Sequence, residues 1–122
     1  MTTNNTGPIR LTDGAHTALR PATEARITGG FWAARRRTNA EVSVPQGPSK
    51  LEEAGNLANL RAAADGKGAF TGDFQFQDSD VHKWLEAASW QLADSPENNQ
   101  LAAHIDELTA LLAAAQDADG YL

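Results

Sequence analysis

Two apolar stripes joined by a short connection constrain the fold of this chain more than any other feature. In the first segment, apolar residues recur every three or four positions, as one face of an α-helix requires: Val81, Trp84, Leu85, Ala88 and Leu92. A second segment repeats this spacing at Leu101, Ile105, Leu108, Leu112 and Ala115. Because only a few residues separate them, the two helices must form an antiparallel hairpin, with the start of the first beside the end of the second.

The residues at the helix ends fit this prediction. Asp78 or Ser79 is expected to cap the first helix, and Asp78 and Asp80 suit the positive end of its dipole. Ser95, followed by proline, is expected to cap the second helix, and Gly120 to end it. Ala87 and Trp90 lie off the first stripe, which predicts a second buried face on that helix.

Two more helices are predicted upstream. Residues 31–44 favour a helix that Pro45 ends. Ser49 and Glu52 form a capping box that opens a helix to about residue 65, weakened in its middle by Gly55. Its apolar face is expected to carry Leu57, Leu60 and Ala64. Residues 1–25 are a polar lead-in, with short strands predicted at 9–11 and 25–28, and residues 74–77 alternate as a short extended piece would.

Composition restricts the classes of function. The chain has 122 residues, about one domain, and no cysteine, so it holds no disulfide, no cysteine-zinc site and no thiolate nucleophile. Six arginines against two acidic residues make residues 1–40 basic, whereas residues 41–122 carry four basic and fourteen acidic residues. An acidic body argues against nucleic-acid binding.

No stretch reaches the length of a membrane span, and the N-terminus lacks a signal-peptide apolar region, so a cytoplasmic protein is expected.

The candidate chemical motifs are weak. Asp78, Asp80 and His82 are metal-ligand types, but on a helix position 80 points about 200° away from position 78, so no metal site is predicted. Pairs at short helical spacing, Asp80 with Lys83 and His82 with Glu86, are expected instead. No pair of carboxylates stands in an apolar frame suited to a glycosidase. Trp84 is expected in the core, whereas Trp32 and Trp90 can serve either a core or a sugar site.

Four stretches, taken in order, resemble one known family. They are ITGGFWAARRRTN from residue 27, NLANLRAAADG from 56, FQDSDVHKWLEAASWQLA from 76, and LLAAAQDADGYL from 111. Together they are similar to the N-terminal part of the β-L-arabinofuranosidase family of glycoside hydrolases, formerly a domain of unknown function. The resemblance covers about residues 25–122, and DSDVxKWLEA paired with AQxxDGYL is its most specific part.

The resemblance implies an all-α fold of antiparallel helical hairpins, the first part of an (α/α)6 toroid, over residues 26–122. It also implies a retaining enzyme that releases L-arabinofuranose, through a zinc-bound cysteine nucleophile and a glutamate acid/base. None of these catalytic or zinc residues can be assigned here, so the chain alone is expected to be inactive and to need no cofactor of its own. Loops that lead into inner helices line the sugar end of such toroids. The expected sugar contacts are therefore Gln77, Asp78, Asp80, Tyr121 and Trp32.

Two hypotheses follow, from different classes. The first is a fragment of such a glycosidase, since the chain stops at Tyr121 and Leu122 directly after a helix terminator and without a polar tail. Exposed apolar helix faces would then favour self-association. The second is a complete, small all-α interaction module that binds a partner through the stripe from Leu101 to Ala115. A third hypothesis is another toroidal sugar enzyme, such as an unsaturated glucuronyl hydrolase. The DSDVxKWL motif from residue 78 disfavours it.

Overall fold

The computed structural model describes residues 25–122, and within them every regular element is helical. The elements are α1 (Gly30–Thr38), the π-helical turn η1 (Asn39–Ser43), α2 (Gly47–Glu53), α3 (Asn56–Ala64), α4 (Asp78–Asp94) and α5 (Asn99–Ala115). This confirms the all-α fold class. The strand predicted at 9–11 lies outside the described residues, and residues 25–28 form no strand.

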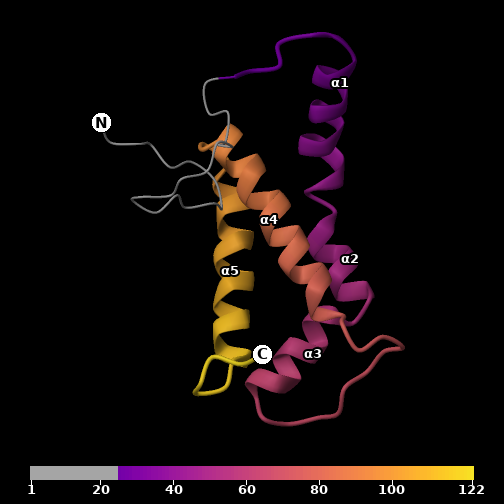
Figure 1. Ribbon diagram of the computed structural model, residues 1–122, viewed down its shortest axis with the longest axis vertical. Coiled ribbons are helices and arrows are strands. Elements are labelled where there is room, and N and C mark those ends of the chain that lie inside the picture. Colours follow the sequence, from indigo (N-terminus) through magenta and orange to yellow (C-terminus); the bar gives the residue numbers. More distant parts are fainter. Residues whose placement is uncertain (1–24) are drawn as a thin grey trace, which may run out of the picture.

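Helices α4 and α5 form the predicted antiparallel hairpin, so α4 begins at the end of the hairpin where α5 finishes (Figure 1). Helix α3 packs across both, and α2 contacts α3 and α4. The segment from α1 to η1 runs beside the C-terminal half of α4 (Figure 1), where Arg36 forms an ion pair with Asp94. The hairpin therefore serves as the frame on which the earlier helices pack.

The buried core confirms both apolar stripes. It draws on α2, α3, α4, α5 and the residue after η1, and its members are Val44, Leu51, Leu57, Leu60, Val81, Trp84, Ala88, Leu101 and Leu108. The remaining stripe residues of α5, Ile105, Leu112 and Ala115, pack against this core. Leu101 and Leu108 of this stripe are buried and its other members are partly buried, so the stripe packs largely within the chain and does not form the free docking face that the interaction-module hypothesis requires. The second buried face of α4 is only partial, because Trp90 is half-buried and Ala87 is exposed.

Trp84 joins α4 to the turn that leads into α2. Its indole Nε1 donates a buried hydrogen bond of 2.9 Å to the carbonyl of Val44. Gly47, the first residue of α2, lies so close that a Cβ atom there would stand 1.9 Å from this same Nε1. Only a glycine allows this approach, so Gly47, Val44 and Trp84 fix the entry into α2 together.

Several predicted helix ends are wrong in detail. Ser49 does not cap a helix: α2 begins at Gly47, and the Ser49 hydroxyl donates to the Gln46 carbonyl at 2.8 Å. The predicted helix is divided at Gly55, whose left-handed φ of 82° separates α2 from α3. The predicted extended piece at 74–77 is not extended, because residues 75–77 form a turn before α4.

The caps of the hairpin also differ from the prediction. Gln77 precedes α4, and neither Asp78 nor Ser79 acts as its cap, because both belong to the helix. At α5 the cap is Asn98 rather than Ser95: its Oδ1 accepts from the Leu101 amide at 3.0 Å. The acids of the first turn of α4 are placed as the dipole argument expects.

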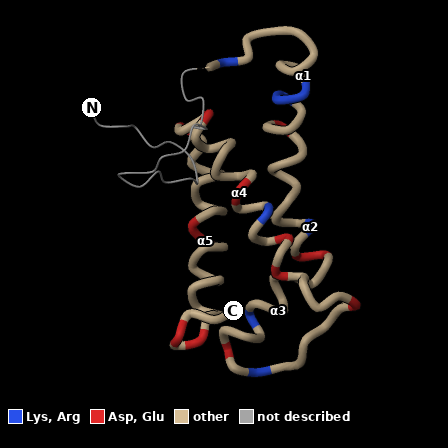
Figure 2. Tube along the Cα trace, in the orientation of Figure 1, with Lys and Arg blue, Asp and Glu red and all other residues tan. Residues whose placement is uncertain are grey.

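Charge is distributed unevenly along the structure (Figure 2). The basic cluster lies on α1, and two of its three arginines already have partners: Arg36 pairs with Asp94, and Arg35 lies 5.0 Å from the centre of the Phe31 ring. In the described residues, no helix is both long enough and apolar enough to cross a membrane.

Candidate functional site

The candidate site is the end of the hairpin where α4 begins and α5 finishes. It contains four of the five predicted sugar contacts, Gln77, Asp78, Asp80 and Tyr121. Gln77 is the last residue before α4, and the two aspartates lie in the first helical turn, where unpaired backbone N–H groups make the local potential positive. The hairpin geometry predicted this grouping from sequence, and the structure brings the four residues to one end.

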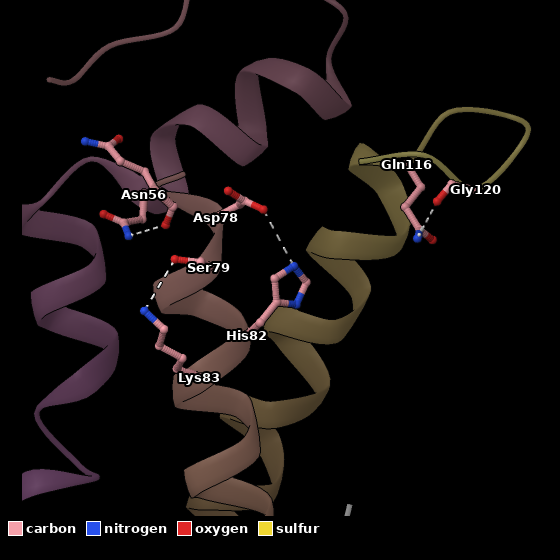
Figure 3. Close-up of polar contacts among 8 residues, drawn as sticks. Asn56, Asp78, Ser79, His82, Lys83, Gln116 and Gly120 are labelled. Atoms are coloured by element: carbon pink, nitrogen blue, oxygen red, sulfur yellow. Dashed lines mark hydrogen bonds and ion pairs between the residues drawn. The ribbon is translucent and has the colours of Figure 1, made fainter. Parts of the chain in front are cut away.

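Gln77 is held by two asparagines of α3. The Asn59 Nδ2 donates to the Gln77 Oε1 at 2.7 Å, and the Asn56 Nδ2 donates to the Gln77 carbonyl oxygen, also at 2.7 Å (Figure 3 shows the Asn56 bond). Asn56 is only 3% exposed, and its Oδ1 has no hydrogen-bond partner within residues 25–122. The position and side chain of Gln77 are therefore set by α3 rather than by α4 alone.

The two aspartates make weaker, exposed contacts on α4 itself. Asp80 Oδ1 lies 3.2 Å from Lys83 Nζ, which confirms that predicted pair. His82 Nε2 lies 4.0 Å from Asp78 Oδ2 (Figure 3), so its acidic neighbour is Asp78, not the predicted Glu86. Because both carboxylates remain about half exposed, they keep lone pairs free to accept hydrogen bonds from a ligand's hydroxyl groups.

Tyr121 follows a tight turn at the end of α5. The turn is closed by bonds from the Gln116 side chain to the Gly120 carbonyl at 3.1 Å (Figure 3) and from the Asp117 amide to the Tyr121 carbonyl at 2.8 Å. The Tyr121 side chain is 74% exposed. It is thus displayed at the candidate site without a protein partner in the described residues.

Trp32 does not join the other four predicted contacts. It lies near the start of α1, whose later residue Arg36 contacts Asp94 at the far end of α4. Trp32 is 66% exposed, with its ring edge-on to Phe31 at a centroid distance of 5.1 Å. The length of α4 separates it from Gln77 and the aspartates.

Sequence reasoning missed the asparagines of α3. Asn56 and Asn59 contact residues 12 to 21 positions away, and no local pattern predicts such contacts.

Sequence reasoning also misassigned Glu52, whose two carboxylate oxygens accept from the Arg61 guanidinium at 2.8 Å each. This pair of hydrogen bonds holds the pKa of Glu52 below its usual value. It links α2 to α3 and lies outside the candidate site.

Metal-ligating side chains do not gather at one place in the part of the chain that the structure describes. Within that part, no cluster of three or more histidine, cysteine, aspartate or glutamate side chains is arranged to hold a metal ion. An open hollow of about 350 Å³ lies between the end of α3 and the loop at Phe70, and its lining contains Lys67 but no carboxylate. The zinc implied by the family resemblance has no fitting set of ligands among residues 25–122.

The fold and site define an all-α protein of packed antiparallel helices with a polar, acid-bearing end. The sequence profile of the β-L-arabinofuranosidase GH127 catalytic domain matches residues 24–122. The chain belongs to this family.

Two known proteins show the extent of the similarity. The chain is 36% identical to the non-reducing end β-L-arabinofuranosidase of Bifidobacterium longum subsp. longum, over 79% of this chain and 17% of that protein. It superimposes on a solved GH127 β-arabinofuranosidase with a TM-score of 0.75 and 37% identity, over 82% of this chain and 16% of that one. The chain thus spans about one sixth of the length of these relatives.

Proposed function

We propose that this chain forms the N-terminal helices of a β-L-arabinofuranosidase catalytic domain, and that it contributes to binding an L-arabinofuranoside rather than to bond cleavage. The observation that carries this proposal is the joint match in sequence and fold to β-arabinofuranosidases, at 36–37% identity and a TM-score of 0.75. At this identity the helices and their end residues are expected to serve the same part of the domain as in the relatives.

The same proposal makes the chain inactive by itself. The family resemblance implies a cysteine nucleophile on zinc and a glutamate acid/base, and this chain has no cysteine. Its own contribution is the start of α4, where the exposed carboxylates of Asp78 and Asp80 can accept hydrogen bonds from furanose hydroxyls. The exposed ring of Tyr121 can stack on the C–H face of the sugar. Trp32, at the other end of α4, is not included in this surface.

Two experiments test the proposal. The chain alone is incubated with a chromogenic aryl β-L-arabinofuranoside, beside the Bifidobacterium enzyme as positive control. No release of the aryl group above buffer is expected, and turnover by the chain would overturn the assignment of an inactive segment. In the second experiment, residues 24–122 replace the matched stretch of the Bifidobacterium enzyme. Retained hydrolysis is expected, whereas a folded hybrid without activity would contradict the shared role.

The hybrid also tests the sugar contacts. Asp78→Ala and Asp80→Ala are each expected to lower kcat/KM by about tenfold or more, since a lost hydrogen bond to a charged group contributes about 1.5–3 kcal/mol. Glu86→Ala, an exposed carboxylate change further along α4, is the matched control and should leave kcat/KM unchanged. Equal effects of all three substitutions would show that charge on the helix, not sugar contact, is being measured.

Exposed apolar side chains fit a role inside a larger domain. Large apolar residues that remain exposed include Phe31, Trp32, Phe70, Phe74 and Phe76. In the proposed domain these side chains face further helices, and in the isolated chain they favour self-association. Light scattering on the purified chain tests this: a particle mass that stays monomeric at all concentrations would count against it. The predicted cytoplasmic location stays a prediction.

A further inference from the structure

The loop from residue 65 to residue 76 enters α4 without any buried side chain of its own. Every residue in it is exposed, including Phe70, Phe74 and Phe76. A loop of this length with no anchor in the core is expected to sample many conformations. The side-chain hydrogen bonds that hold it therefore decide how well its position is defined.

Asn59 supplies most of these bonds. Its Nδ2 donates to the Thr71 carbonyl at 2.8 Å and to the Gln77 Oε1 at 2.7 Å. Its Oδ1 accepts from the Thr71 amide and from the Thr71 hydroxyl, both at 3.0 Å. Both donor hydrogens and both acceptor lone pairs of the amide are thus used, which is the full capacity of an asparagine side chain. One residue of α3 fixes the middle and the end of the loop.

Two further contacts hold Gln77 in the position that Asn59 requires. Asn56 donates to its carbonyl oxygen at 2.7 Å. The Gln77 side chain lies directly against Gly72, where an added Cβ would stand 2.1 Å from the Gln77 Nε2. The side chain is therefore enclosed between Asn59 on one side and the loop backbone on the other.

We propose that Asn59 is a latch: its side chain holds residues 71–77, the second half of this loop with Gln77, in one conformation, and this half opens as a unit when those hydrogen bonds break. The proposal concerns the conformation of this chain and does not depend on the proposed function. If the sugar contacts of α4 are confirmed, Asn59 becomes the positioning residue for Gln77.

Amide hydrogen exchange of the whole chain, followed by NMR, tests the latch. The Thr71 amide is the probe, since Asn59 is the acceptor that the structure gives it. Asn59→Ala removes all four bonds, Asn59→Asp keeps only the accepting pair, and Thr71→Val removes only the hydroxyl bond. Exchange at position 71 is expected to rise in the order Thr71→Val, Asn59→Asp, Asn59→Ala. The last should be at least about fivefold faster than the parent, as a net contribution of about 1 kcal/mol implies.

Two internal controls separate a latch from general loosening. The Lys67 amide bonds the Ala62 carbonyl at 3.0 Å within the same loop but without Asn59, and the Leu108 amide lies in the hairpin core. The Lys67 amide should exchange as in the parent, whereas the Leu108 amide, which exchanges through unfolding of the core, reports the change in overall stability. An unchanged rate at position 71 in Asn59→Ala, or an equal rise at positions 67 and 71, would overturn the proposal. Should Asn59→Ala fail to fold, the ranking of the other two variants against the parent decides by the same criteria.

Discussion

Gly47→Ala is expected to destabilise this protein although it replaces a helical glycine by alanine. Inside a helix that exchange normally stabilises by up to about 1 kcal/mol. Here the new Cβ would stand 1.9 Å from the Nε1 and 2.0 Å from the Cδ1 of Trp84. The indole is buried and bonded to the Val44 carbonyl, so it cannot move aside without losing that bond.

The magnitude follows from two costs and one gain. Overpacking a core site costs about 1–3 kcal/mol. Displacing the indole leaves its buried N–H without a partner, at a further cost of about 1–3 kcal/mol. After subtracting the helix gain, the free energy of unfolding is expected to fall by about 1–5 kcal/mol. With a urea slope of about 2 kcal/mol per molar, a loss of about 3 kcal/mol lowers the unfolding midpoint by about 1.5 M.

Urea unfolding followed by circular dichroism at the helix band measures this change. Gly29→Ala is the control, since a Cβ at Gly29 would meet nothing within 4 Å. Its cost should stay below about 1 kcal/mol, the range of helix-cap effects. The decisive comparison repeats Gly47→Ala in a Trp84→Leu background, where no ring stands in the way. The substitution should there be neutral or stabilising. An equal loss in both backgrounds would refute the steric argument.

Two further predictions concern the links between helices. Removing the charge with Glu52→Gln should destabilise the chain at neutral pH by the small amount typical of an exposed pair, because the pKa of Glu52 is lowered by its bonds to Arg61. Because the pKa of Glu52 is lower in the folded chain, this stabilisation is present above the unfolded pKa and is lost as pH falls through the folded pKa. The difference between parent and variant should therefore shrink as the solution is acidified, and a difference that stays constant contradicts the assignment. Asn98→Ala should lower the free energy of unfolding by about 1 kcal/mol through loss of the bond from the Leu101 amide, whereas Ser95→Ala should have a smaller effect. A larger loss of stability for Ser95→Ala would show that Ser95, the cap predicted from the sequence, stabilises α5 more than Asn98 does.

The helices could be predicted from sequence because their apolar stripes are periodic and their connection is short. Both properties are local, and burial of Val81 and Ala88 follows from them directly. The helix ends could not be predicted as well. Several residues near each end can cap, and the packing of neighbouring segments decides among them, as at Asn98 and Ser95.

The same limit applies to the candidate site. The hairpin geometry placed Gln77, Asp78 and Tyr121 at one end, because that consequence needs only two helices and a turn. It could not place Trp32, since the position of α1 depends on long-range contacts such as the pair of Arg36 with Asp94. The hydrogen bonds from α3 to Gln77 join residues that are 18 to 21 positions apart, and such contacts produce no periodic pattern in the sequence.

The two ends of α4 are stabilised by different means, and this has a consequence for how the chain tolerates change. From Val81 to Ala88, α4 is held by buried apolar side chains and by the Trp84 bond, so substitutions there act on the whole fold. At its start, the loop and Gln77 are held by amide side chains of α3 over an exposed surface. Hydrogen bonds of this kind contribute about 1 kcal/mol each, and their loss opens only the segment that they hold. The end proposed to meet the sugar can therefore change its sequence and conformation while the helical frame behind it stays intact.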